Sequence, residues 1–335
     1  GFRNPVYDAV LGQSADGARA AFEALSGDEH ANLRGMLIED TRFLRQAVLA
    51  RGPDMAGAGM AGAGMAVWGQ VVGSWSDVDS DGNAAGYKRS NKGLLTGFDG
   101  AVGEHWRVGA VLGYGTSEMH SRGSADLKSK NYQAGSYISG TFDRFTVQLG
   151  GSYGWHDVRS QRTVAIGSFA NSLSADYDLH TLQGFGEVAW RTQLGQVQFE
   201  PFAGAAIVRL SGGALRETGG AAALQGRSDR LDTSYANAGI RMRTGVLLGG
   251  IDMRVVGSGG VRQLLHGRVP TADLSFAQGQ PFRIAGAPLA RTAFVGDLGL
   301  EADLSQRLTL GVSYAGQFAK RNTDNGVRAQ LNWRF

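Results

Sequence analysis

The chain has 335 residues, of which 52 are glycine, 6 are proline and none is cysteine, and its formal net charge is +3. A mean hydropathy of −0.17 excludes a helical membrane protein, and the small charge gives no sign of a nucleic-acid partner. The lack of cysteine excludes disulfides and thiolate metal sites. Abundant glycine with little proline favours strands that bend and twist over a disordered linker.

The first fifty residues have a helical character. No secretory signal is visible at Gly1–Pro5, so we expect a mature product or a fragment. A short helix is predicted from Ala15 to Leu25. Apolar residues between Leu33 and Val48 then recur at steps of three, four and seven, which predicts a second helix from about Asp28 to Leu49. At 1.5 Å per residue it would be roughly 30 Å long, about the hydrocarbon thickness of a bilayer.

An uncharged stretch follows, from Met55 to Ser76. Its length would suit a membrane helix. However, it contains six glycines, and each costs roughly 1 kcal/mol in a helix. We therefore expect a flexible tether that runs into a strand.

From residue 65 onward the hydrophobic period changes to two. In Phe145–Trp155 the alternate positions carry Phe, Val, Leu, Gly, Tyr and Trp, and the positions between them carry small or polar residues. Val327–Phe335 shows the same alternation and ends on an aromatic residue. Since successive side chains of a strand point to opposite faces, each segment has one apolar and one polar face. Twelve such segments are predicted, starting near residues 65, 91, 106, 130, 145, 178, 197, 231, 249, 290, 307 and 326.

The predicted connections alternate between short and long. Such an alternation places all long loops at one end of an up-and-down antiparallel sheet. An even number of strands with apolar faces bounded by aromatics is typical of an outer-membrane barrel. The soluble alternative, a lipocalin-like barrel or a large sandwich, would bury the apolar face inside. The sequence thus favours an all-β transmembrane fold, a 12-stranded antiparallel up-and-down β-barrel, with the N-terminal α-helix threaded through its lumen.

A helix, a tether and twelve strands in this order resemble the translocator β-domain of autotransporters, the proteins of type V secretion. The likeness covers nearly the whole chain. The motifs that carry it are Ala66-Val67-Trp68-Gly69, Thr96-Gly97-Phe98-Asp99-Gly100, Glu200-Pro201-Phe202-Ala203, Leu310-Gly311-Val312-Ser313-Tyr314 and Asn332-Trp333-Arg334-Phe335.

The resemblance implies a division of the chain and a function. Residues 1–27 would be the passenger junction, residues 28–52 the lumen helix, residues 53–64 the tether and residues 65–335 the barrel. The barrel would lie in the outer membrane of a Gram-negative bacterium and assist secretion of its own N-terminal passenger to the surface. The helix would remain in the pore as a plug.

The resemblance also implies partners. Besides the passenger, these are the outer-membrane lipid and the barrel-assembly machinery, which would read the C-terminal signal formed by Leu331, Trp333 and Phe335. A monomeric barrel is expected. No cofactor or metal is expected, because the six histidines are scattered without metal-ligand spacing.

In some family members the passenger is released by cyclisation of an asparagine, helped by carboxylates of the lumen. Asn32, near the start of the long helix, is the candidate here. The chain lacks the paired asparagines of the best-known self-cleaving subgroup, which favours an ordinary helical asparagine.

A helix inside a barrel needs polar partners, because its charges leave bulk water. We expect Arg34, Arg42 and Arg45 of the helix to meet carboxylates on the lumen side of the strands. The candidate carboxylates are Glu187, Asp297 and Glu301. Pairing that holds the plug is favoured over acid–base catalysis.

Two other classes of protein stay open at this point. An outer-membrane enzyme of the omptin or phospholipase type would need a catalytic cluster, and a diffusion porin would not need the helix. Gly150–Gly154 fits the nucleophile-elbow pattern around Ser152, but it lies within an alternating strand and not at a strand–turn–helix corner. The chain itself is expected not to be an enzyme.

Overall fold

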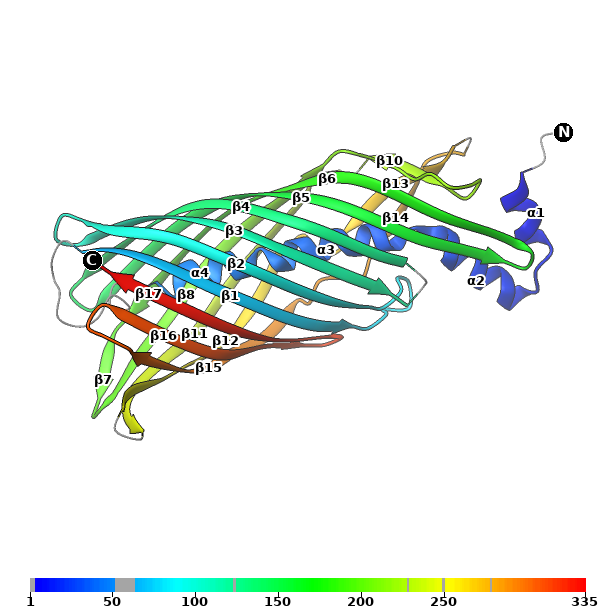
Figure 1. The fold of residues 1–335 in the computed structure, drawn as a ribbon. Helices are drawn as coiled ribbons and strands as arrows, with labels where there is room; N and C mark the ends of the chain where they lie inside the picture. Colours follow the sequence, from blue (N-terminus) through cyan, green and yellow to red (C-terminus); the bar gives the residue numbers. More distant parts are fainter. Residues whose placement is uncertain (1–3, 52–63, 123–124, 228, 249–250, 278) are drawn as a thin grey trace.

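The computed structural model describes residues 4–51, 64–122, 125–227, 229–248, 251–277 and 279–335, and within them the chain forms a closed antiparallel barrel (Figure 1). The last strand pairs with the first, and β8 pairs with β11, so the barrel sheet is closed. The prediction of a 12-stranded barrel is confirmed. Its strands are β1 (Met65–Val78), β2 (Tyr87–Val102), β3 (Trp106–Ser121), β4 (Ala125–Phe142), β5 (Phe145–Ile166), β6 (Phe169–Trp190), β8 (Val197–Gly212), β11 (Leu231–Leu248), β12 (Ile251–His266), β15 (Thr292–Asp303), β16 (Leu308–Ala319) and β17 (Asn322–Arg334).

Aromatic residues on the outer face mark an apolar band around this barrel. On β3 the band runs from Trp106 to Tyr114, which are 40% and 48% exposed. Tyr114 is level with Tyr132 of β4, and the two ring centroids are 5.3 Å apart. At the other edge the ring of Phe142 lies 5.4 Å from that of Trp106. A tilted strand needs about 9 to 11 residues to cross a bilayer, so this band has the height of a membrane.

The two ends of the barrel differ. At the short-turn end the strands are joined by tight connections, such as residues 143–144 between β4 and β5. At the long-loop end β5 and β6 continue far beyond the aromatic band and meet in a hairpin at Gly167, whose φ is +57°. The sequence predicts a loop over residues 157–176. That prediction is wrong, because both strands remain paired throughout.

Where this hairpin leaves the aromatic band, the apolar face of β5 changes from the outside of the barrel to the inside. Up to Trp155 the apolar side chains of β5 face outward. Beyond it Val158 and Val164 are buried inside, while Arg159 and Gln161 are exposed outside. An apolar face that turns inward indicates water, and not lipid, on the outside.

Four helices precede the barrel, and the last two run through its lumen (Figure 1). They are α1 (Pro5–Leu11), α2 (Ala15–Ser26), α3 (Asp28–Asp40) and α4 (Arg42–Leu49). The predicted long helix is thus interrupted once, at Thr41, whose hydroxyl donates to the carbonyl of Ile38 at 2.7 Å. Every residue of α3 is buried. Gly27 joins α2 to α3 with a φ of +71°, which a residue with a side chain would adopt only under strain.

None of the helices among the described residues is both long and apolar enough to cross a membrane. The uncharged stretch from Met55 to Ser76 belongs to β1 from residue 65 onward. Its earlier part, with the predicted tether, lies outside the described residues except for Gly64.

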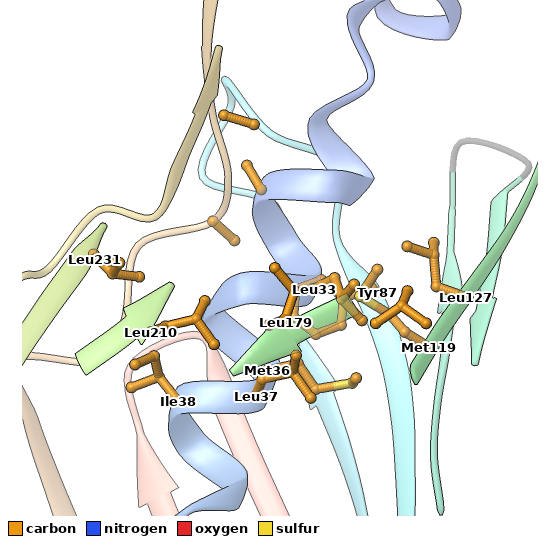
Figure 2. Close-up of a cluster of buried hydrophobic side chains, with 14 of the residues drawn as sticks. Leu33, Met36, Leu37, Ile38, Tyr87, Met119, Leu127, Leu179, Leu210 and Leu231 are labelled. Atoms are coloured by element: carbon orange, nitrogen blue, oxygen red, sulfur yellow. The ribbon is translucent and has the colours of Figure 1, made fainter. Parts of the chain in front are cut away.

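A small second sheet lies at the long-loop end beside α3. Its strands are β9 (Ala214–Arg216), β10 (Leu224–Arg227), β13 (Thr271–Phe276) and β14 (Phe282–Ala285), and the three-residue strand β7 (Thr192–Leu194) extends the barrel sheet. Leucines from this sheet and from the barrel wall surround α3. Figure 2 shows this core, in which Leu33, Met36, Leu37 and Ile38 of the helix lie against side chains such as Leu210. A helix so enclosed is held by burial of its apolar face.

Candidate functional site: the helix in the barrel lumen

Charged side chains surround the break between α3 and α4. We call them the collar; they are Glu39, Asp40, Arg42, Arg89, Arg262 and Asp324. Glu39 accepts hydrogen bonds from Nη1 and Nη2 of Arg262 on β12, both at 2.9 Å. It also accepts from Gln317 at 3.2 Å, and Nη1 of Arg42 lies 3.6 Å away. All four side chains are buried. A two-pronged contact between guanidinium and carboxylate combines charge with geometry, so it fixes the rotation of the helix as well as its depth.

The collar continues on the opposite side of the helix. Asp40 pairs with Nη1 of Arg89 at 2.6 Å and accepts from the hydroxyl of Ser117 at 2.7 Å. Arg89 also reaches Asp324 of β17 at 2.8 Å, and Asp324 pairs with Arg42 of the helix at 2.6 Å. Since a buried charge without a partner is strongly destabilising, these pairs oppose withdrawal of the helix.

A second contact holds the helix end at the short-turn end of the barrel. Arg51 donates to Asp99 from Nε at 3.0 Å and from Nη2 at 2.7 Å. Asp99 also accepts from the hydroxyl of Tyr137 at 2.8 Å, and that hydroxyl accepts from the indole of Trp68 at 3.0 Å. Leu44 and other apolar residues of α4 pack on the same wall. The helix is therefore held against one side of the lumen.

A third cluster lies where the helix enters the lumen at the long-loop end. Nε2 of His30 donates to the carboxylate of Glu217, and Nδ1 is hydrogen-bonded to the hydroxyl of Tyr177, each at 3.0 Å. Arg162, on the β5 extension, contacts Glu29 at 3.0 Å and Glu217 at 2.6 Å. Burial opposes ionisation of Glu217, but hydrogen bonds from His30 and Arg162 outweigh it and lower its pKa to about 2. Burial raises the pKa of Glu29, in spite of the charges of His30 and Arg162.

The same cluster is where a metal ion would find three ligands, because oxygen or nitrogen atoms of Glu29, His30 and Glu217 lie within 4.8 Å of one another. However, Nε of Arg162 lies 3.0 Å from Glu29 and 3.1 Å from Glu217. The guanidinium already supplies the positive charge between the carboxylates, so the arrangement favours an ion-pair lock over a cation site. Residues 29–30 and 217 are far apart in the chain, so spacing in the sequence gave no signal of this cluster.

The predicted arginines of the helix have different surroundings. Arg42 is part of the collar. Arg34 donates to the carbonyl oxygens of Asp229 and Thr271, so it meets backbone and not a wall carboxylate. Arg45 donates to Gln183 of β6 at 3.0 Å. The helix residues that sequence reasoning missed are the two acids, Glu39 and Asp40.

The predicted wall carboxylates pair with arginines of the wall, which corrects the expected partners. Glu187 lies 2.6 Å from Arg241. The remaining two follow the same rule: Asp297 lies 3.4 Å from Arg328, and Glu301 lies 3.3 Å from Arg254. All three acids nevertheless line the cavity that Arg42 and Arg45 also line. The structure therefore places all the predicted residues except Arg34 around one cavity. Among the described residues, no ion pair joins a predicted arginine of the helix to a predicted carboxylate of the wall. Neighbouring strands offer arginines at closer range than the helix does.

Asn32 is buried in α3, and both ends of its amide are engaged. Its nitrogen donates to the carbonyl of Ala85 at 3.3 Å, and its oxygen accepts from the backbone of Ala287 at 2.6 Å. The residue bridges two long connections to the helix.

The C-terminal residues Leu331, Trp333 and Phe335 lie at the short-turn end on the outer surface. Leu331, Trp333 and Phe335 are 45%, 51% and 60% exposed. The backbone nitrogen of Phe335 donates to the carbonyl of Met65 at 3.0 Å, which completes the closure of the barrel.

Ser152 lies inside strand β5, pairs in register with Gln183 and accepts from its amide at 2.9 Å. Gln183 also donates to the carbonyl of Thr41 at 3.1 Å. Ser152 is therefore connected to the helix through Gln183. It does not occupy the strained corner that a nucleophile elbow needs.

The profile of the Autotransporter beta-domain matches residues 67–315, most of the barrel. The chain belongs to the autotransporter β-domain family. Barrels of this family are outer-membrane translocators with an associated passenger, and this chain is such a translocator domain.

Two curated relatives and two solved structures agree with this assignment. The relatives are both described as "Extracellular serine protease" of Serratia marcescens, at 28% and 27% identity over 99% of the translocator. The translocator spans 32% of their length, about one third.

The solved structures share the fold. The translocator domain of NalP from Neisseria meningitidis matches with a TM-score of 0.67 and 19% identity, over 89% of this chain and 96% of that one. The beta domain of the Bordetella autotransporter BrkA matches with a TM-score of 0.63 and 22% identity, over 82% of this chain and all of that one.

Proposed function

We propose that this translocator exports a passenger that precedes residue 1 and then keeps α3 and α4 in the pore as a plug. The observation that carries the proposal is the collar: Glu39, Asp40 and Arg42 are held by buried partners from β2, β12 and β17. The chain before Gly27 leaves the lumen at the long-loop end (Figure 1). A passenger attached there would lie outside the cell, with the long-loop end facing outward and the short-turn end facing the periplasm.

The proposal assigns a role to each part of the chain. Residues 1–27 are the passenger junction, residues 28–52 the lumen helix, residues 53–64 the tether and residues 65–335 the membrane barrel. The aromatic band contacts outer-membrane lipid, and the C-terminal residues Leu331, Trp333 and Phe335 contact the barrel-assembly machinery. The barrel functions as a monomer.

The activity of the whole protein belongs to the passenger in this proposal. Both curated relatives are described as extracellular serine proteases, and most of their length lies outside the matched region. A secreted protease is therefore the passenger we propose.

Self-cleavage at Asn32 is not part of the proposal. Cyclisation requires the side-chain nitrogen to reach the residue's own carbonyl carbon. Here that nitrogen donates to Ala85, and the amide oxygen is held by Ala287. The cavity carboxylates Glu187 and Glu301 are engaged by wall arginines. We propose that Asn32 serves to anchor the helix.

The test is a fusion of a small reporter domain to the N-terminus, produced with a secretory signal in a Gram-negative host. Protease added to intact cells should remove the reporter, while a matched fusion without residues 65–335 should be protected. A protected reporter beside a folded, heat-modifiable barrel would disprove export.

The plug is tested by single-channel recording. The conductance should be small for the whole chain and rise when residues 1–52 are removed. A large, steady conductance of the whole chain would instead indicate a porin.

A further inference from the structure

Among the described residues, the positive and negative charges around the helix break are unequal in number. Four guanidinium groups and three carboxylates lie there, and the carboxylates are Glu39, Asp40 and Asp324. Arg42, Arg89 and Arg262 each contact at least one of them. The fourth guanidinium, that of Arg45, contacts none within ion-pair distance among the described residues. Within the part of the chain that the structure describes, one positive charge therefore has no carboxylate partner.

Arg45 is well buried, with 8% of its surface exposed. Its contacts among the described residues are polar but uncharged: Nη1 donates to Gln183 at 3.0 Å, and the guanidinium lies 6.0 Å from the ring centroid of Tyr235. Arg262 lies over the same ring at 4.8 Å, so a second cation is close by. A buried guanidinium in such surroundings is costly unless a counter-charge is present.

The space next to Arg45 is large enough for such a counter-charge. A cavity of about 280 Å³ lies between α4 and the far wall of the barrel. Seven arginines, Arg45 and Arg262 among them, and five carboxylates line it; the carboxylates are Glu187, Glu200, Asp297, Glu301 and Asp324. Each of these carboxylates already contacts an arginine other than Arg45.

We propose that Arg45 and the neighbouring Arg262 form a binding site for inorganic phosphate in this cavity. Arg45 uses Nη1 for Gln183, which leaves Nε and Nη2, the edge of the guanidinium that binds oxyanions with two parallel hydrogen bonds. Nε of Arg262 is a further buried donor without a hydrogen-bond partner among the described residues. The anion supplies the missing charge and thereby stabilises the plugged barrel. This inference depends on the position of the helix and not on the identity of the passenger.

The experiment measures the unfolding temperature of the whole chain in detergent, with and without inorganic phosphate. Sodium concentration is held constant with a bulky sulfonate as the balancing anion. Phosphate should raise the unfolding temperature of the wild type by about 2 to 6 °C, because it binds the folded state alone. In Arg45→Gln the unfolding temperature should not respond to phosphate. It should also exceed that of the wild type when phosphate is absent, because the uncompensated charge is gone.

Two variants serve as controls. Arg159→Gln makes the same charge change on the exposed outer face of β5 and should respond to phosphate as the wild type does. Arg45→Lys keeps the charge but loses the planar edge, so it should need more phosphate for the same shift. An equal phosphate response in Arg45→Gln and Arg159→Gln would overturn the proposal, as would a wild type that does not respond. Migration of the unheated barrel on a gel shows separately that each variant has folded.

Discussion

Glu39 of the helix and Arg262 of the barrel wall face each other in the middle of the lumen, joined by two hydrogen bonds of 2.9 Å. They are 223 residues apart in the chain. This pair connects the N-terminal helix to β12 and thus to the wall opposite the side on which α4 packs.

Removing one member should loosen the plug. Glu39→Gln leaves Arg262 buried without its counter-charge, which we expect to destabilise the folded barrel by about 3 to 5 kcal/mol. Denaturant unfolding and single-channel recording test this, the second by a higher and noisier conductance. The matched control is Asp303→Asn, which breaks the half-exposed pair with Arg254 and should change stability by less than about 1 kcal/mol. Similar values for the two variants would contradict the role of the collar.

The apolar core around α3 should contribute as much to the free energy of unfolding as the collar does. Leu37 is fully buried among leucines of the wall. Leu37→Ala should lower the free energy of unfolding by about 2 to 5 kcal/mol, because it leaves a cavity. Leu11→Ala makes the same change on α1, where 65% of the side chain is exposed, and should have little effect. If both variants unfold at the denaturant concentration of the wild type, the helix is not held by this core.

Acid should weaken the cluster at the long-loop end through Glu217. Its pKa in the folded chain is about 2, below the ordinary value of 4.5, so its ionised form favours folding. This stability is complete above about pH 4.5 and is lost as the pH falls toward 2, and a shift of this size corresponds to roughly 3 kcal/mol. Glu29, whose pKa is raised, acts in the opposite direction.

Denaturant midpoints between pH 7 and pH 2.5 measure this effect. In Glu217→Gln the free energy of unfolding should fall less on acidification than in the wild type, by roughly 3 kcal/mol. Asp16→Asn, at an exposed pair with Arg19, should follow the wild type. A wild type and a Glu217→Gln variant with parallel pH profiles would count against the lock.

Deletion of Phe335 should impair insertion into the outer membrane more than it impairs strand formation in detergent. The side chain is exposed and its ring packs against that of Trp333, tilted by 35° with the centroids 4.9 Å apart, while its backbone makes one closing hydrogen bond. Heat-modifiability in detergent and the yield in outer-membrane fractions measure the two effects. Phe145→Ala, at a similarly exposed aromatic residue of the same end, should change neither much. Equal losses in membrane and detergent would reduce Phe335 to an ordinary strand end.

From Asp157 onward the structure differs from the sequence-based prediction of a loop. The inward–outward alternation of β5 continues there without a break, whereas the predicted loop requires it to stop. What changes is the position of the apolar residues, which move from the outward to the inward side, as at Val158 and Val164. A search for outward apolar residues ends at Trp155, because the strand then enters water and its apolar side serves a protein core.

The amino-acid sequence by itself determined the barrel, its strand number, its aromatic band and the presence of a helix of pore length, because these follow from local periodicity. It also indicated some of the charged residues that line the lumen, among them Arg42, Arg45 and Glu187, but not Glu39 or Asp40. Only the tertiary structure decided the partners: Glu39 with Arg262, Asp40 with Arg89 and Glu187 with Arg241. The reason is physical. Periodicity tells on which face a side chain lies, but ion pairs act over a few ångströms, and the rotation and depth of the helix that set those distances arise from the packing of the whole barrel.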